Sequence, residues 1–156
     1  MLPAHRLKIV LVEPEIPQNA GNVARLCAVA GAEFHLVRPL GFFVTDRHFK
    51  RAGMDYLKHV TMHVHDDLAA LLAVIGTAPV WITSGFGTRP HWDARFTPDD
   101  WIFFGKESAG LPAALRQTYA DRELVIPMLP DQRGLNLATS AGIVLYEALR
   151  QIAGAS

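Results

Sequence analysis

The chain has few cysteines and no long apolar runs, the features that mark exported and membrane proteins. Its single cysteine, Cys27, rules out an intramolecular disulfide and fits a reducing compartment. The apolar run at residues 7–12 is too short for a signal-peptide core and ends at Glu13, and no run approaches membrane-spanning length. We therefore expect a cytoplasmic protein that does not enter a membrane.

The chain also lacks an excess of charge of either sign. Lysine plus arginine and aspartate plus glutamate each number 15, so the formal net charge is zero. A neutral chain argues against a broad basic surface for nucleic acid, although a local basic patch remains compatible with it. With 156 residues, half of them hydrophobic, the sequence predicts one globular domain spanning residues 1–156.

Several common catalytic signatures are missing. There is no Walker A pattern and no Gly-x-Ser-x-Gly elbow, and Gly85-Phe-Gly87 lacks the third glycine and the following helix of a dinucleotide loop. The seven histidines are scattered without cysteine or carboxylate spacing typical of zinc, so no metal site is expected. Cys27 falls on an apolar helix face, which favours a buried thiol over a nucleophile.

The hydrophobic pattern alternates between strands and helices, which predicts an α/β fold with a mainly parallel sheet flanked by helices. The expected strands cover residues 7–12, 34–37, 60–64, 80–83, 101–104 and 124–126. The expected helices start at Asn19 or Asn22 and end at Gly31, then cover residues 46–52, 66–75, 112–119 and 135–152. Ligands bind outside the carboxyl ends of strands in such sheets, so the loops there should carry the function.

Three of these loops hold unusual polar and glycine-rich segments. They are Pro14-Glu-Ile-Pro-Gln-Asn-Ala-Gly-Asn-Val-Ala-Arg25, Phe104-Gly-Lys-Glu-Ser-Ala-Gly-Leu-Pro112 and residues 126–150. Arg25 lies in the first turns of its helix, where a cation does not complement the helix dipole. The third segment opens a long amphipathic helix with free backbone amides beside a glycine and an arginine, which suggests a small-molecule or RNA pocket.

In this order, the three segments resemble the three motifs of the SPOUT superfamily of RNA methyltransferases. The resemblance is greatest to the TrmL (YibK-like) family, which methylates the 2′-hydroxyl of the wobble cytidine or uridine of tRNA. It rests on Pro14-Glu-Ile-Pro17, Asn19-Ala-Gly-Asn22, Arg25-Leu-Cys27, Phe104–Pro112, Ile126-Pro-Met128, Arg133-Gly-Leu-Asn-Leu137 and Tyr146-Glu-Ala148. Arg51-Ala-Gly-Met-Asp-Tyr56 also resembles a family segment, so the likeness covers nearly the whole chain.

The resemblance implies a fold and a set of partners. It implies a deep C-terminal trefoil knot, which hydrophobic patterns alone do not predict because knots are very rare. It also implies S-adenosylmethionine as cofactor, tRNA as substrate, with leucine tRNAs expected, and a homodimer packed through the first and last helices. No metal is needed for the chemistry.

The resemblance also implies roles for individual residues. The cofactor-binding residues would be Ile82, Gly105, Ile126, Met128, Gly134 and Leu135. The catalytic residues would be Arg25, Glu107 and Asn136, with Glu107 holding Arg25 in place. The RNA-binding residues would be Asn19, Arg133 and Tyr146. Because a guanidinium is a poor general base, Arg25 is expected to orient the hydroxyl and stabilise developing negative charge, not to act as a base.

The chain departs from the family pattern at two positions. Gly134 and Ala138 stand where the family commonly has serines, so a role for either hydroxyl cannot be carried over. The alternatives are a 2′-O-methyltransferase acting on ribosomal RNA, a non-catalytic RNA-binding protein on the same fold, and a nucleotide-binding enzyme that does not methylate.

Overall fold

A computed structural model describes residues 1–155 and contains a seven-stranded sheet in the order β3-β2-β1-β6-β4-β7-β5. Every strand pair in it is parallel, which confirms the predicted mainly parallel sheet. The strands are β1 (Lys8–Val12), β2 (Glu33–Val37), β3 (Met62–His65), β4 (Val80–Thr83), β5 (Arg89–Pro90), β6 (Trp101–Phe104) and β7 (Glu123–Val125).

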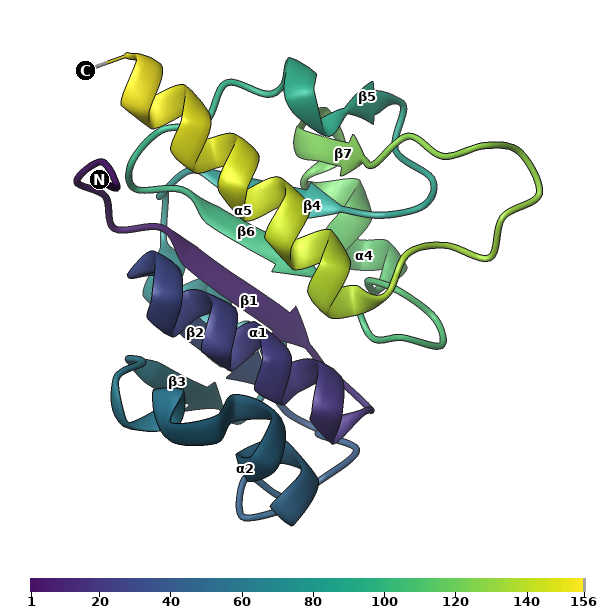
Figure 1. The fold of residues 1–156 in the computed structure, drawn as a ribbon. Helices are drawn as coiled ribbons and strands as arrows, with labels where there is room; N and C mark the ends of the chain where they lie inside the picture. The colour runs from purple at the N-terminus through teal and green to yellow at the C-terminus, as the bar shows by residue number, and fades with distance from the viewer. Residues whose placement is uncertain (156) are drawn as a thin grey trace.

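Helices cover both faces of this sheet (Figure 1). The α-helices are α1 (Pro17–Ala30), α2 (Arg47–Gly53), α3 (Leu68–Ile75), α4 (Ala113–Thr118) and α5 (Leu137–Gly154). Residues 1–155 also contain three 3-10 helices, each in the connection leading to a strand: η1 (Met54–Lys58), η2 (His91–Asp93) and η3 (Ala120–Arg122). One face packs against α1, α2 and α5, and the other against α3 and α4.

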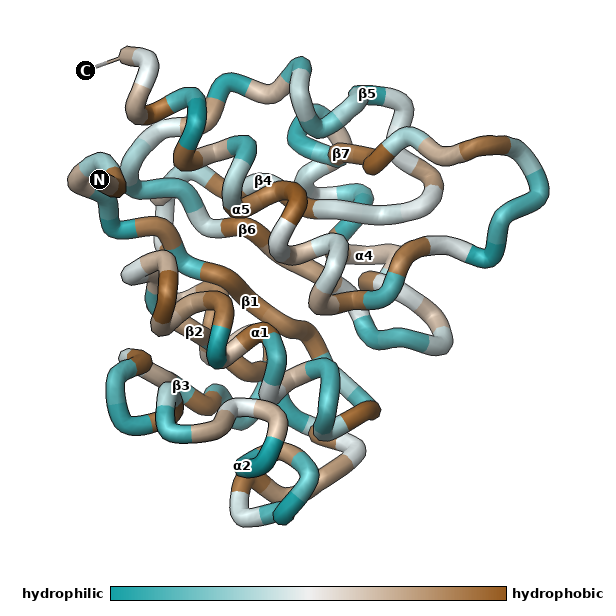
Figure 2. The backbone as a smooth tube through the Cα atoms, in the orientation of Figure 1, coloured by the Kyte–Doolittle hydropathy of each residue, from teal (hydrophilic) through white to brown (hydrophobic). Residues whose placement is uncertain are grey.

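The central strands are apolar on both sides because both faces are covered. In β1, Ile9 and Leu11 belong to the core beneath α1 and α5, whereas Val10 and Val12 belong to the core beneath α3. The hydropathy colouring follows this, with brown running along β1 and β6 in the middle of the sheet (Figure 2). Cys27 is fully buried in the first core and its burial raises the pKa of the thiol, which confirms the prediction of a core cysteine.

The start of α1 differs from the prediction. The helix begins at Pro17, so Asn19 and Asn22 lie inside it and neither caps it. Proline suits this place because its fixed φ matches the helix and it has no amide hydrogen to satisfy. The cap residue Ile16 offers no side-chain acceptor, and the carboxylate of Glu107 accepts a hydrogen bond from its amide instead.

Smaller differences lie at other element ends. Asp67, and not Asp66, caps α3 through a bond from the amide of Ala70. The final helix starts at Leu137 because Asn136 caps it. No strand was predicted around Pro90, but this segment contains the short strand β5. A proline is tolerated in β5 because the strand forms the edge of the sheet.

Candidate functional site

A cavity of about 620 Å³ opens at the carboxyl ends of β4, β6 and β7. Its wall comes from the three loops that follow these strands and from the start of α1, including residues 83–85, 104–107 and 132–137. The volume lies within the range of about 300–1,000 Å³ typical of small-molecule sites. This main cavity therefore lies where an open parallel sheet is expected to bind a ligand.

Most of the predicted cofactor residues line the main cavity, namely Gly105, Ile126, Met128, Gly134 and Leu135. Ile82 does not line it. That side chain is fully buried in the core beneath α3 and α4, while Thr83 and Ser84 reach the cavity. The difference follows from strand geometry, because successive side chains of β4 point to opposite faces and only its end meets the loops.

Gly105 is required by its own loop. A Cβ atom built on it would lie 2.1 Å from the carbonyl carbon of Gly110 and 2.3 Å from the amide nitrogen of Leu111. The loop folds back onto this position, and the amide of Gly110 donates to the carbonyl of Lys106. A glycine is therefore needed at this position so that residues 110–111 can approach its backbone.

Glu107 joins this loop to the start of α1. Its carboxylate accepts hydrogen bonds from the amides of Glu15 at 2.8 Å and Ile16 at 3.1 Å, and from the side-chain amide of Asn19 at 3.3 Å. The expectation that Glu107 holds Arg25 is therefore wrong. The carboxylate satisfies amides that a helix start leaves free, and its negative charge suits the positive end of the helix dipole.

A second carboxylate closes the same junction from the other side. Glu15 accepts hydrogen bonds from the hydroxyl of Ser108 at 2.6 Å and from its amide at 2.8 Å. These two bonds, aided by the charge of Lys106, hold the pKa of Glu15 below its ordinary value. The first and second motifs are thus bound to each other by reciprocal carboxylate contacts.

Asn19 continues the connection to the third motif. It is only 8% exposed, and its carbonyl oxygen accepts a hydrogen bond of 2.9 Å from the side-chain amide of Asn136. The oxygen of Asn136 in turn accepts from the amides of Ala138 and Thr139 at the start of α5. Because Asn19 is buried and bonded at both ends of its amide, its position suits a structural link and not the predicted RNA contact.

Arg25 lies in a neighbouring side pocket of about 420 Å³ between α1 and α5, which Asn136, Ala138 and Thr139 also line. Its guanidinium donates to the sulfur of Met54 at 3.4 Å and lies 5.1 Å from the ring centroid of Tyr56. Within residues 1–155, no carboxylate forms an ion pair with it. The guanidinium is therefore held by side chains of η1 and not by a carboxylate.

Asn136 lines both the main cavity and the side pocket of Arg25. Hydrogen bonds through Asn19 link Glu107 to Asn136, and Arg25 shares the side pocket with Asn136, so the three predicted catalytic residues lie in one region. Met54 and Tyr56 were not predicted as partners of Arg25, although they lie in the segment Arg51–Tyr56 that resembles the family.

The two remaining predicted RNA contacts are both exposed. Arg133 is exposed and lines the main cavity, whereas Tyr146 is 45% exposed on α5 and lines neither pocket. Tyr146 follows Thr139 by two helical turns, so it lies on the same face of α5 as the side pocket. Both side chains are accessible to a large substrate.

Replacing Glu107 with glutamine is expected to lower the free energy of unfolding by about 1–3 kcal/mol, because the charged acceptor of three hydrogen bonds is replaced by a group that also carries donors. Urea unfolding followed by circular dichroism measures this. Asp55→Asn is the control, since Asp55 is exposed and has no described bond. Equal stability of Glu107→Gln and the unaltered protein would show that the carboxylate does not hold the junction.

Comparison with known proteins identifies the family to which this chain belongs. The sequence matches the model of the SpoU rRNA methylase family over residues 6–146. A tRNA (cytidine(34)-2′-O)-methyltransferase of Burkholderia pseudomallei is 46% identical over 148 residues, which cover 92% of this chain and 94% of that protein.

Solved structures have the same fold. One structure, which concerns 2-OH methylation of C/U34 on tRNA, has a TM-score of 0.93 and 45% identity, covering 97% of this chain and 99% of the other. A SpoU methyltransferase of Streptomyces viridochromogenes in complex with the cofactor AdoMet has a TM-score of 0.87 and 25% identity, covering 97% of this chain and 62% of that one. With the family match spanning most of its length, the chain belongs to the SpoU rRNA methylase family.

Proposed function

We propose that the protein transfers a methyl group from S-adenosylmethionine to the ribose 2′-hydroxyl of the wobble nucleotide, cytidine or uridine, of tRNA. The observation that carries this proposal is that Asn136 borders both a cofactor-sized cavity and the pocket of an unpaired arginine. A methyl donor in one pocket and an acceptor ribose in the other would meet beside it. The substrate follows from the relatives, which are named for cytidine 34 and for C/U34 of tRNA.

The main cavity suits the cofactor because it combines apolar side chains with backbone groups. Ile126, Met128 and Leu135 offer apolar walls for an adenine ring and a methionine chain, and the glycine-rich loops leave backbone atoms accessible. The bound cofactor supplies a methyl group on a sulfonium, which is already activated for transfer without a metal. The task left to the protein is to hold donor and acceptor in line.

Arg25 is proposed to bind the acceptor ribose. A guanidinium donates several hydrogen bonds in a fixed plane and is a poor base, so it orients the 2′-hydroxyl and stabilises the negative charge that develops on its oxygen. Asn136 is proposed to fix the geometry between the pockets, since Asn19 and the amides of α5 hold both ends of its side chain. Arg133 and Tyr146 are proposed to contact the RNA around the site.

We also propose a homodimer and a C-terminal knot. The dimer would pack through α1 and α5, where Val29 of α1 is 49% exposed beside Thr139 of α5. The knot is supported by the return of α5 from β7 across β6 to α1 (Figure 1). The mass of a single chain in light scattering would contradict the dimer. An experimental structure whose backbone path has no knot when its two ends are pulled apart would contradict the knot.

Introducing the family serine by Gly134→Ser is expected to lower the affinity for S-adenosylmethionine several-fold without raising methyl transfer. Gly134 has a φ of 110°, which side chains rarely adopt, so the substitution strains the cavity wall at a cost of about 1–3 kcal/mol even though open space surrounds it. Calorimetric titration and a transfer assay measure both effects. Gly134→Ala is the matched control for strain, and faster transfer by the serine variant alone would show that the missing hydroxyl matters.

The substrate is tested by incubating the protein with S-adenosylmethionine and total RNA, followed by mass-spectrometric mapping of 2′-O-methylated nucleosides. We expect methylation of nucleotide 34 in a subset of tRNAs, with leucine tRNAs predicted among them. Methylation confined to ribosomal RNA would show that ribosomal RNA, and not tRNA, is the substrate. If no new modification appears, the result would favour a non-catalytic RNA-binding role. The cytoplasmic location stays a prediction, and no helix within residues 1–155 is long and apolar enough to cross a membrane.

A further inference from the structure

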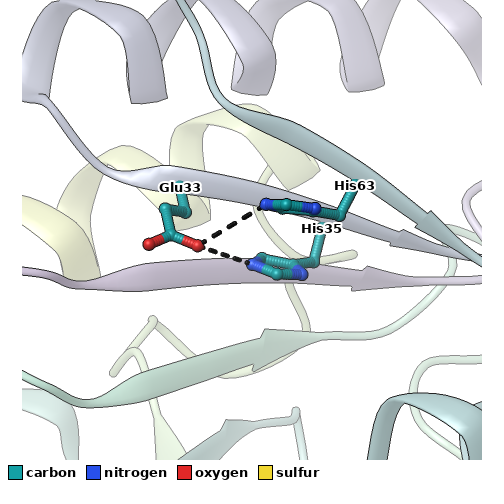
Figure 3. A group of neighbouring side chains, drawn as sticks. All are labelled: Glu33, His35 and His63. Carbon is teal, nitrogen blue, oxygen red and sulfur yellow. Dashed lines mark hydrogen bonds and ion pairs between the residues drawn. The ribbon is translucent and has the colours of Figure 1, made fainter. Parts of the chain in front are cut away.

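Glu33, His35 and His63 form a compact group on β2 and β3, away from both pockets (Figure 3). The parallel register places His35 beside His63, and Glu33 precedes His35 by two residues, so all three side chains project from the same face of the sheet. One potential ligand atom from each residue lies within 4.8 Å of the other two. Two imidazoles and one carboxylate are a ligand set typical of first-row divalent transition ions.

The distances around the carboxylate are close to those of a metal site. One oxygen of Glu33, Oε2, lies 3.3 Å from Nε2 of His35 and 3.7 Å from Nε2 of His63. A tetrahedral ion with bonds of about 2.0–2.2 Å holds its ligand atoms about 3.3–3.6 Å apart. The His35 and His63 rings stack with centroids 4.6 Å apart, so His63 must turn to direct its lone pair inward. Its side chain is exposed and has room to do so.

His35 is the anchored member of the group. It is 3% exposed, and its Nδ1 lies 2.9 Å from Nε2 of His65 on the neighbouring strand. When Nδ1–H donates to His65, the lone pair of Nε2 faces the carboxylate of Glu33, an arrangement that a cation between them stabilises. Histidines that bind metals almost always donate their other ring N–H to an acceptor, commonly a carboxylate, a backbone carbonyl or water, and here the acceptor would be an imidazole nitrogen. His65 therefore supplies the outer contact that a metal-binding histidine needs.

We propose that Glu33, His35 and His63 bind a divalent ion of the zinc class, with solvent at the remaining position. The ion would link β3, which within residues 1–155 is an edge strand paired with β2 alone, to the rest of the sheet. Lys8 of β1 is paired with Glu33 in the parallel register, and its ammonium group lies over the Trp101 ring at 5.5 Å. A cation so near weakens binding, so we expect micromolar affinity.

The test uses the full chain without a histidine tag, freed of metal, and titrated with Co²⁺ as a spectroscopic probe and then with Zn²⁺ by calorimetry. We expect one equivalent to bind, the visible absorption of low-coordinate cobalt to appear and Zn²⁺ to remove it. Zn²⁺ should also raise the unfolding temperature by a few degrees, because an ion that binds only the folded chain stabilises it.

Two variants and a control make the assignment specific. Glu33→Gln and His63→Gln should each weaken Zn²⁺ binding at least tenfold, whereas His59→Gln, an exposed histidine outside the group, should leave it unchanged. The proposal is overturned if the unaltered protein binds no stoichiometric ion, or if His59→Gln weakens binding as much as His63→Gln does. Neither readout depends on methyl transfer.

Discussion

Replacing Arg25 with alanine is expected to reduce methyl transfer by about 10²–10³-fold while leaving S-adenosylmethionine affinity within about twofold. The loss has the size seen when a donor to a developing oxyanion is removed. Cofactor binding should persist because Arg25 lies in the side pocket and does not line the main cavity. Single-turnover transfer to tRNA and calorimetric titration with the cofactor measure the two quantities separately.

Two further variants test whether the loss of transfer is specific to the guanidinium of Arg25. Arg25→Lys keeps the charge but loses the planar fork, so transfer should stay well below that of the unaltered protein. Arg95→Ala removes an exposed arginine without a described partner and should change nothing. Folding should survive in Arg25→Ala, since the lost contact with Tyr56 is worth about 0.5–1 kcal/mol. Near-normal transfer by Arg25→Ala would remove this residue from the proposed mechanism.

Replacing Gly105 with alanine is expected to raise the dissociation constant for S-adenosylmethionine more than tenfold and to lower the unfolding temperature by several degrees. The added Cβ would lie 2.1 Å from a backbone carbon of Gly110 and 2.3 Å from the amide of Leu111, and these atoms cannot yield as a flexible side chain can. The loop that lines the cavity must therefore move and would pull Glu107 away from α1. Calorimetric titration and thermal unfolding measure the two effects.

Gly85→Ala is a matched control for this prediction. Gly85 also lines the main cavity, but a Cβ on it meets nothing within 4 Å. We expect its cofactor affinity and stability to stay near those of the unaltered protein. If both alanine variants bind the cofactor equally well, the packing of Gly105 against its own loop does not shape the site.

The sequence predicts the layered fold well because the periodicity of apolar residues, and the glycines and prolines that end strands, are local properties of the chain. The strands at 80–83 and 101–104 have the predicted bounds, and the helices around them agree to within a few residues. The start of α1 was misplaced because its amides are satisfied by Glu107, about 90 residues away in the chain. No local capping pattern records such a distant acceptor.

The same reason explains what sequence analysis found and missed at the site. Motifs identify Arg25, Glu107 and Asn136, but not which of them touch one another. Glu107 binds Asn19 and not Arg25, and Arg25 contacts Met54 and Tyr56, because helix and loop geometry decide these pairings. The group of Glu33, His35 and His63 was missed because a parallel register joins residues 28 positions apart, and no spacing pattern in the sequence records that pairing.

The central claim is that the protein methylates the ribose 2′-hydroxyl of the wobble nucleotide. The most direct measurement compares transfer of labelled methyl groups from S-adenosylmethionine to two versions of a tRNA that differ by one atom, with a hydroxyl or a hydrogen at the 2′ position of nucleotide 34. We predict transfer to the first and none above background to the second. Equal labelling of both, or labelling of neither, would contradict the account.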